Sequence, residues 1–285
     1  MRYRLRHVTR YRYAEPVDLA AHLLHLTPRV LPQQAVLAAT LTATPEPART
    51  VTRPDHFGNT AGWLFLDAPH DRFAVTLAAE VAVAFPAPPL AARTLRWEQV
   101  AADGMTGEAA EFAFASPLVS DEPAAGAYAA ASFPAGRPVL AGLLDLTARI
   151  RRDFAFRPGA TTVATPVARV LAQRAGVCQD FAHLMIAGLR ALGLPARYVS
   201  GYVRTRPPPG EAARRGADQS HAWVGAWLGP GLGWVDLDPT NDLVVAEEHV
   251  VLGWGRDFGD VSPLRGVILG GGAHDVAAEV ELEAL

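Results

Sequence analysis

The strongest constraint in this sequence is that three chemically matched side chains lie on three different predicted elements. The single cysteine, Cys178, stands just before an apolar-periodic run, 181–192, that predicts a helix. His221 opens a predicted strand, and Asp238 ends the strand that follows. Since these positions are far apart along the chain, only a fold that packs the helix against neighbouring strands can bring them together.

The position of Cys178 favours a reactive thiol. Gly176 breaks the chain just before it, so the cysteine is expected in the first turn of the helix. Unpaired backbone N–H groups and the positive end of the helix dipole stabilise a thiolate at such a position, and the thiolate is the form that attacks acyl carbons. The alternative is a buried and inert cysteine, because free cysteine is among the most buried residue types.

A cysteine nucleophile also needs an imidazole that takes its proton and a carboxylate that orients the imidazole. His221, in the segment Ser220-His-Ala-Trp223, can supply the imidazole. Asp236 and Asp238 can each supply the carboxylate, because alternate residues of one extended strand point to the same face. The period of the strand does not separate these two aspartates.

The chain divides into a β-rich first part and a second part in which helices precede strands. Alternation and turn signals predict strands at 3–13, 37–44, 60–66 and 72–85, helices at 139–154, 167–174 and 181–192, and strands at 196–203, 221–228, 233–238, 249–252 and 276–282. We therefore predict an α+β fold: a β-sandwich-like domain at 1–95, a connecting segment at 96–135 and a catalytic core at 136–285.

Composition excludes several classes of partner. The net charge is −3, and the alternating arginines near the N-terminus predict a solvated strand face, so we expect no nucleic-acid partner. No apolar run approaches the roughly 20 residues that span a bilayer, and no apolar signal core opens the chain. A single cysteine forms no intramolecular disulfide, so we expect a protein of the reducing cytoplasm, without a membrane partner.

Several motifs in order resemble the transglutaminase-like superfamily, whose layout is related to that of papain-like cysteine proteases. In the second half they are Thr165-Pro166, Gly176-Val-Cys178, Gly193-Leu-Pro-Ala-Arg-Tyr-Val-Ser-Gly-Tyr202, Ser220-His-Ala-Trp223, Trp234-Val-Asp-Leu-Asp-Pro-Thr-Asn241 and Gly255-Arg-Asp-Phe-Gly-Asp260. The first half resembles the β-rich domain that precedes this core in bacterial members, through Tyr11–Tyr13, Leu26-Thr-Pro-Arg29 and Asp55-His-Phe-Gly-Asn59. The resemblance implies a transglutaminase-like core of helices packed on an antiparallel sheet.

The resemblance also implies the roles of three residues. Cys178 is the nucleophile, His221 is the general base and then the acid, and Asp238 orients the imidazole because the family carboxylate directly precedes Pro-Thr. The implied chemistry is acyl-enzyme formation on a peptide or carboxamide bond, with hydrolysis as the favoured outcome. Acyl transfer to an amine and a non-catalytic binding module with an idle triad are the alternatives.

We expect a peptide or protein substrate and no cofactor. A metal site built from the single cysteine, a histidine and an aspartate is the alternative that we disfavour, because the sequence shows no metal-ligand spacing and no aspartate-rich calcium loop. The oligomeric state stays open, as does the question of whether the loop 204–216 gates the site.

Other chemistry-bearing residues have structural interpretations. His183, five residues after the cysteine, does not face it well on a helix and is expected to be a packed or surface histidine. Asp180 is expected to cap the first turn. Trp223 and Tyr202 suit an acyl groove or the core equally. An ion pair explains Arg256-Asp-Phe-Gly-Asp260 as well as a substrate contact does.

Overall fold

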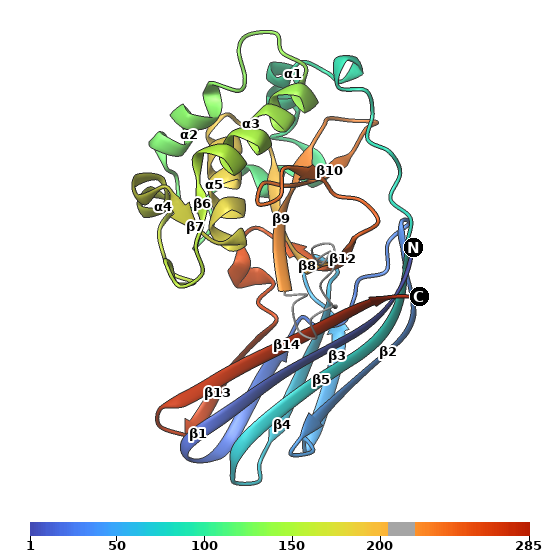
Figure 1. Ribbon diagram of the computed structural model, residues 1–285, viewed down its shortest axis with the longest axis vertical. Helices are drawn as coiled ribbons and strands as arrows, with labels where there is room; N and C mark the ends of the chain where they lie inside the picture. Colours follow the sequence, from blue (N-terminus) through green and yellow to red (C-terminus); the bar gives the residue numbers. More distant parts are fainter. Residues whose placement is uncertain (205–219) are drawn as a thin grey trace, which may run out of the picture.

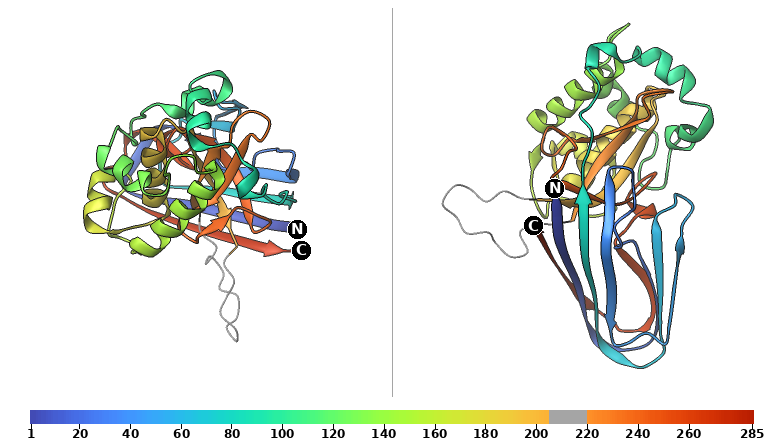
Figure 2. Two further views of the ribbon diagram at one scale, coloured as in Figure 1. Left: turned by 90° about the horizontal axis from the view of Figure 1, so that it is seen from above. Right: turned by 90° about the vertical axis from the view of Figure 1, so that its right-hand side faces the viewer.

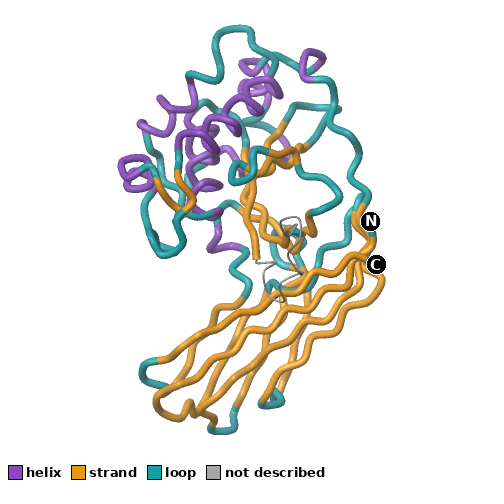
Figure 3. Tube along the Cα trace, in the orientation of Figure 1, coloured by secondary structure: helices purple, strands orange, loops and turns teal. Residues whose placement is uncertain are grey.

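The computed structural model describes residues 1–204 and 220–285, which form two lobes (Figure 1). One lobe consists of long antiparallel strands, and the other combines helices with a second antiparallel sheet (Figure 3). The predicted loop 204–216 lies, except for its first residue, outside the described residues. No helix among the residues described is long and apolar enough to cross a membrane.

The β lobe is one antiparallel sheet of seven strands built around a single long strand, β1. Its order is β2-β5-β1-β4-β3, with two further strands on β1. The bounds are β1 Arg2–Leu24, β2 Gln34–Thr44, β3 Arg49–Pro54, β4 Thr60–Leu66, β5 His70–Val83, β13 Leu264–Gly270 and β14 His274–Ala284.

The sheet folds back on itself at the middle of β1. The first half of β1 pairs with β5 and β14, and the second half pairs with β4 and β13. The register of the β1–β5 pair shifts between Arg12 and Val17, where the bend lies. The two layers enclose a common apolar core that includes Val17, Leu66 and Phe73. The β-sandwich-like prediction is therefore confirmed, in the form of one bent, half-barrel sheet (Figure 2).

The last two strands do not belong to the sheet of the second lobe. The sequence interpretation grouped them with residues 136–285, but β13 and β14 pair with β1 and extend the N-terminal sheet. Val280 and Leu282 of β14 are buried against Tyr3 and Leu5 of β1. Alternation along a strand shows which face is buried but not which strand lies beside it, so this partnership was not predictable from the local pattern.

The core lobe packs helices on one face of a five-stranded antiparallel sheet. The sheet order is β11-β10-β9-β8-β12. Its strands are β8 Ala196–Val203, β9 Ser220–Trp227, β10 Trp234–Asp238, β11 Leu243–Val244 and β12 His249–Gly255. The helices are α1 Trp97–Asp103, α2 Pro123–Ala130, α3 Val139–Asp153, α4 Val167–Gln173 and α5 Cys178–Ala191. Short 3₁₀ turns lie at Ala91–Arg93 (η1), Gly107–Ala113 (η2) and Phe258–Asp260 (η3), and β6 Ala155–Phe156 pairs with β7 Ala175–Gly176.

Helix α5 is the centre of this lobe. Eleven of its residues are buried, and it contacts α2, α4 and the strands β8 and β9. A helix that is apolar around most of its circumference is stable only inside a core. Its position fixes the start of α5, and with it Cys178, against the sheet. The predicted core architecture of helices on an antiparallel sheet is confirmed.

The β lobe contacts the edge strand β12 of the core sheet through a polar seam, formed by Gln34 and Asn59. Gln34 is fully buried and exchanges hydrogen bonds with the backbone of Val251, donating at 2.7 Å and accepting at 2.8 Å. Asn59 is also fully buried and does the same with the backbone of Trp254, donating at 2.8 Å and accepting at 2.9 Å. Both partners lie on β12, so the β lobe supports the edge strand of the core sheet directly.

Candidate active site

Cys178 is the first residue of α5 and is half-buried. Asp180 caps this helix start, because its Oδ2 accepts a hydrogen bond from the Val177 N–H at 2.7 Å. A Cβ on Gly176 would lie 2.7 Å from that same oxygen. Only glycine therefore fits before the helix. The predictions that the helix begins just after Gly176 and that Asp180 caps its first turn are confirmed.

The segment before α4 is tied to the same helix start. The Thr161 hydroxyl donates to Asp180 Oδ2 at 2.6 Å, and the Gln179 side chain donates to the carbonyl of Val163 at 3.0 Å. Burial raises the pKa of Asp180 above its usual value, while the hydrogen bonds from Thr161 and Val177 lower it. These contacts place residues 161–163 beside the cysteine. Sequence reasoning missed Thr161.

The structure brings His221 and Asp238 into direct contact. His221 Nε2 lies 2.7 Å from Asp238 Oδ2, and the carboxylate is fully buried. A carboxylate only accepts, so Nε2 carries the hydrogen. The Asn241 amide lies 3.4 Å from the same Nε2, and the Cys178 thiol is the other side chain besides Asp238 that raises the pKa of this imidazole. With Nε2 occupied, Nδ1 is the nitrogen left for the thiol.

The surroundings shift both titrating partners toward an ion pair. Burial alone would lower the pKa of His221, but hydrogen bonds with Asp238 and Cys178 outweigh it and raise the pKa to about 10. Burial alone would raise the pKa of Asp238, but hydrogen bonds from His221 and His249 hold it well below its usual value. At neutral pH the imidazole is therefore protonated beside an ionised carboxylate.

Asp236 has different partners from Asp238. Its Oδ2 accepts a hydrogen bond from the Trp223 indole at 3.1 Å, and its Oδ1 lies 3.7 Å from the Arg197 guanidinium. Arg197 in turn lies over the ring of Trp254, 3.8 Å from its centroid. Asp236 thus balances a buried arginine, and Asp238 is the aspartate that contacts His221.

Further donors, which sequence reasoning missed, surround Asp238. The Asn241 amide donates to Oδ2 at 2.6 Å, and the backbone N–H of Thr240 donates to Oδ1 at 2.9 Å. His249 Nε2 lies 3.5 Å from Oδ2. The Pro-Thr-Asn turn after an aspartate is the local signal that could have revealed Asn241. His249, on another strand, has no such signal.

The remaining sequence candidates are structural. His183 is buried and accepts a hydrogen bond from the Phe258 N–H at Nε2 (3.2 Å), and burial lowers its pKa to about 4. Trp223 and Tyr202 are fully buried, and the Tyr202 hydroxyl lies 2.6 Å from His7 Nδ1. These observations favour the core interpretation for both aromatic residues over a groove.

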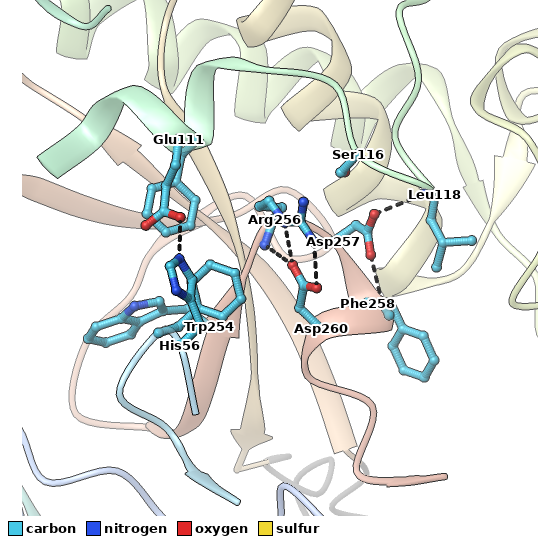
Figure 4. Close-up of polar contacts among 12 residues, drawn as sticks. His56, Glu111, Ser116, Leu118, Trp254, Arg256, Asp257, Phe258 and Asp260 are labelled. Atoms are coloured by element: carbon cyan, nitrogen blue, oxygen red, sulfur yellow. Dashed lines mark hydrogen bonds and ion pairs between the residues drawn. The ribbon is translucent and has the colours of Figure 1, made fainter. Parts of the chain in front are cut away.

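The motif after β12 makes polar contacts within itself and with neighbouring segments (Figure 4). Arg256 pairs with both oxygens of Asp260, at 2.9 and 3.0 Å. The carboxylate of Asp257 accepts from the backbone N–H groups of Leu118 and Gly259, at 2.9 and 2.8 Å. The ion-pair interpretation of this motif is therefore sufficient.

No metal site accompanies this arrangement. Within residues 1–204 and 220–285, no group of three or more histidine, cysteine, aspartate or glutamate side chains is placed to hold a metal ion. The described geometry places an imidazole against a buried carboxylate, and the chemistry that such a pair can support is proton transfer.

Two family models match the chain. The bacterial transglutaminase-like N-terminal region matches residues 3–82, and the transglutaminase-like superfamily model matches residues 131–239. Cys178, His221 and Asp238 all lie within the second match. The β13–β14 hairpin lies beyond both.

Several known proteins are similar to the chain. An uncharacterized protein of Mycobacterium tuberculosis (strain ATCC 25618 / H37Rv) is 43% identical over 276 residues, which cover 94% of this chain and 87% of the relative. An uncharacterized protein of Mycobacterium leprae (strain TN) is 33% identical over 285 residues, which cover 100% of this chain and 99% of the relative. A protein-glutamine gamma-glutamyltransferase of Pseudomonas aeruginosa is 34% identical over 116 residues, or 38% of this chain and 17% of that protein.

One solved structure has the same fold over the whole chain. It is the crystal structure of a Cytophaga hutchinsonii protein that is provisionally named a cysteine protease. The TM-score is 0.79 at 24% sequence identity, and the superposition covers 100% of this chain and 91% of that one. At this identity the likeness concerns the fold, including the two-lobed arrangement.

Proposed function

Because this chain belongs to the transglutaminase-like superfamily, we propose that it carries out cysteine-dependent acyl-enzyme chemistry on peptide or carboxamide bonds, with hydrolysis as the overall reaction. Cys178 is the proposed nucleophile, His221 the acid and base, and Asp238 the orienting carboxylate. The observation that carries the proposal is the 2.7 Å contact between His221 and Asp238, with the Cys178 thiol as the imidazole's other partner.

In the first step the Cys178 sulfur attacks the carbonyl carbon of the substrate. The C=O bond becomes a C–O⁻ single bond, and the backbone N–H of Cys178, unpaired at the helix start, is a donor for this oxyanion. The C–N bond then breaks, and His221 gives its proton to the departing amine or ammonia. The product of this step is a thioester on Cys178.

In the second step water replaces the thiol. His221 now takes a proton from the water as it attacks the thioester carbonyl, and the C–S bond breaks as the carboxylic acid forms. The sulfur and the imidazolium regenerate the starting pair. Asp238 keeps its contact with Nε2 throughout and stabilises the imidazolium each time it forms.

The raised pKa of His221 supports this assignment. An imidazolium next to a sulfur is the setting in which cysteine nucleophiles are activated. With the His221 pKa raised to about 10 by Asp238 and Cys178, the imidazole stays protonated through the neutral range. This state is suited to protonating a leaving amine.

Acyl transfer to an amine is the second candidate. The named protein-glutamine gamma-glutamyltransferase among the relatives is 34% identical, but over only 38% of this chain. Both reactions pass through the same thioester and differ in whether water or an amine receives the acyl group. We favour hydrolysis because the sequence offers no recognisable acceptor-amine site.

Thiol reactivity is the first test, because it needs no knowledge of the natural substrate. We expect iodoacetamide to alkylate Cys178 in mildly acidic solution much faster than it alkylates a free thiol, and we expect His221→Ala to remove this advantage. Equal rates for the wild-type protein, the variant and a free thiol would leave an idle triad as the better description.

The second test separates the two reactions. The protein is incubated with a glutamine-containing peptide library, with and without a labelled primary amine. Release of ammonia or of shorter peptides that depends on Cys178 supports hydrolysis. Incorporation of the label that depends on Cys178 would instead establish acyl transfer. A cytoplasmic location and a peptide substrate remain predictions, which fractionation and this assay address.

A further inference from the structure

The carboxylate of Asp238 has more donors than the orientation of one imidazole requires. Its Oδ1 accepts from the Thr240 N–H, and its Oδ2 faces His221 at 2.7 Å, Asn241 at 2.6 Å and His249 at 3.5 Å. His221 is expected beside Oδ2 for the proposed chemistry, and Asn241 comes from the turn that directly follows Asp238. His249 belongs to β12, an edge strand of the core sheet, and its presence needs a separate explanation.

Packing alone explains His249 poorly. The side chain is only 2% exposed, and Nδ1 is buried without a hydrogen-bond partner among the described residues. A buried polar atom without a partner lowers the free energy of unfolding, whereas an apolar side chain of similar size would incur no such cost. The ring packs edge-on against Trp223, with 5.2 Å between centroids, a contact that phenylalanine would also make.

The atom that does have a partner is Nε2. Because a carboxylate only accepts, the Nε2 that faces Oδ2 carries the hydrogen, and Nδ1 is the bare nitrogen. The titratable groups that face this ring are Asp238 from β10 and His221 from β9, whose ring centroid lies 6.5 Å away. Asp236, two residues earlier on β10, is engaged by Trp223 and Arg197.

We propose that His249 is a positioning residue, which holds Oδ2 of Asp238 toward His221. The inference rests on the proposed function, because it assigns a role in keeping the His221–Asp238 pair aligned. Asn241 fixes the carboxylate from its own turn, and His249 fixes it from another strand of the core sheet.

The seam between the lobes connects this positioning to the β lobe. His249 begins β12, and Gln34 of the β lobe holds the backbone of Val251 two residues further on. The strand that carries His249 is thus anchored by a fully buried side chain from the other lobe. A rigid strand is a suitable support for a residue that acts only through its position.

The test compares two variants of full-length protein. His249→Phe keeps the ring and removes the donor, while His249→Gln keeps an N–H donor near the position of Nε2. The rate of alkylation of Cys178 by iodoacetamide is measured across the pH range for both. We expect His249→Phe to lose about three- to tenfold in rate, the weight of one hydrogen bond, and the limb on which its alkylation rate rises with pH to move to higher pH. His249→Gln should stay close to wild type in both.

Two results would overturn the inference: a His249→Phe profile that superimposes on that of wild type, or equal losses in the Phe and Gln variants. Nitrogen NMR of histidine-labelled wild-type protein gives an independent answer if His249→Phe does not fold. His249 must show its hydrogen on Nε2, and a hydrogen on Nδ1 would contradict the proposal. If wild-type Cys178 is no more reactive than a free thiol, the proposed function fails, which is a different outcome from a reactive wild type with an inert His249.

Discussion

Replacing Asp238 with asparagine should strongly lower the pKa of His221. The substitution keeps the size of the side chain and removes the negative charge that lies 2.7 Å from Nε2. The pKa of His221 is raised from 6.5 to about 10 by Asp238 and Cys178 against the effect of burial. A rise of that size corresponds to about 5 kcal/mol in favour of the imidazolium, shared between the two partners.

Without the carboxylate, burial becomes the dominant influence on His221. We therefore expect the pKa of His221 in Asp238→Asn to fall to its ordinary value or below, so that the imidazole is neutral at neutral pH. Because the thiolate then loses its imidazolium partner, the rising limb of the Cys178 alkylation profile should move to higher pH, toward that of a free thiol. Turnover at neutral pH should fall by about two to four orders of magnitude, as when the orienting aspartate of a catalytic triad becomes asparagine.

Asp236→Asn is the matched control. Asp236 lies on the same strand two residues earlier, and its partners are Trp223 and Arg197. This variant should lose stability, because Arg197 is buried and loses a counter-charge, but its alkylation profile should keep the wild-type limb. A wild-type limb in Asp238→Asn, or a shifted limb in Asp236→Asn, would refute the assignment of the orienting carboxylate.

Three further substitutions and one change of pH test the supporting structure. Gly176→Ala should destabilise the protein by about 1–3 kcal/mol and slow alkylation of Cys178, since its Cβ would lie 2.7 Å from the capping oxygen of Asp180; chemical denaturation measures the first effect. Burial lowers the pKa of three histidines to about 4; these are His7, His22 and His183. As the pH drops from about 6.5 to about 4, these side chains bind protons in the unfolded chain before they do so in the folded protein. The free energy of unfolding should therefore fall by about 3 kcal/mol for each histidine. His22→Phe should remove its share of that acid sensitivity in urea titrations, since neither nitrogen of His22 has a partner in the described residues. Gln34→Leu should destabilise by about 2–5 kcal/mol, because it leaves the N–H and C=O of Val251 without their buried partner; an unchanged midpoint would show that the seam contributes little.

Local patterns predicted most of the elements. The strand at 60–66 and the strand at 196–203 match β4 and β8 in both bounds. Helix 181–192 was predicted from its apolar period, and α5 begins three residues earlier because the Asp180 cap adds a turn without apolar residues. Patterns of this kind succeed where burial on one face dictates the residue types.

The elements that were missed have weak local signals. β3 is short and lies between prolines, and its residues are mostly exposed, so no apolar face marks it. β13 carries Gly266 and Gly270 and is also largely exposed. Both strands form because a neighbour offers its backbone, β4 for β3 and β1 for β13. Backbone pairing of this kind leaves little trace in the side chains of the added strand.

Some residues of the candidate site could likewise be identified from the local sequence, and others could not. Cys178, His221 and Asp238 stand in motifs that identify them, but the choice of Asp238 over Asp236 depended on resemblance, since both point to one face of β10. Geometry separates them through their partners, because one meets an imidazole and the other a guanidinium. His249 was beyond sequence reasoning altogether, because its strand joins the sheet on the far side of β8 from His221.

The position of His249 also indicates how the β lobe can influence the chemistry. The five-stranded sheet holds Asp238 on β10 and His221 on β9, while His249 reaches the same carboxylate from β12, the strand that Gln34 and Asn59 clasp from the other lobe. A carboxylate with contacts to His221 and His249 is sensitive to the spacing of β9, β10 and β12. Loosening the seam at Gln34 should therefore lower the reactivity of Cys178 in the folded protein, in addition to its effect on stability. Alkylation rates measured well below the melting transition of Gln34→Leu distinguish this coupling from unfolding, because a rate equal to that of wild type would show that the seam serves stability alone.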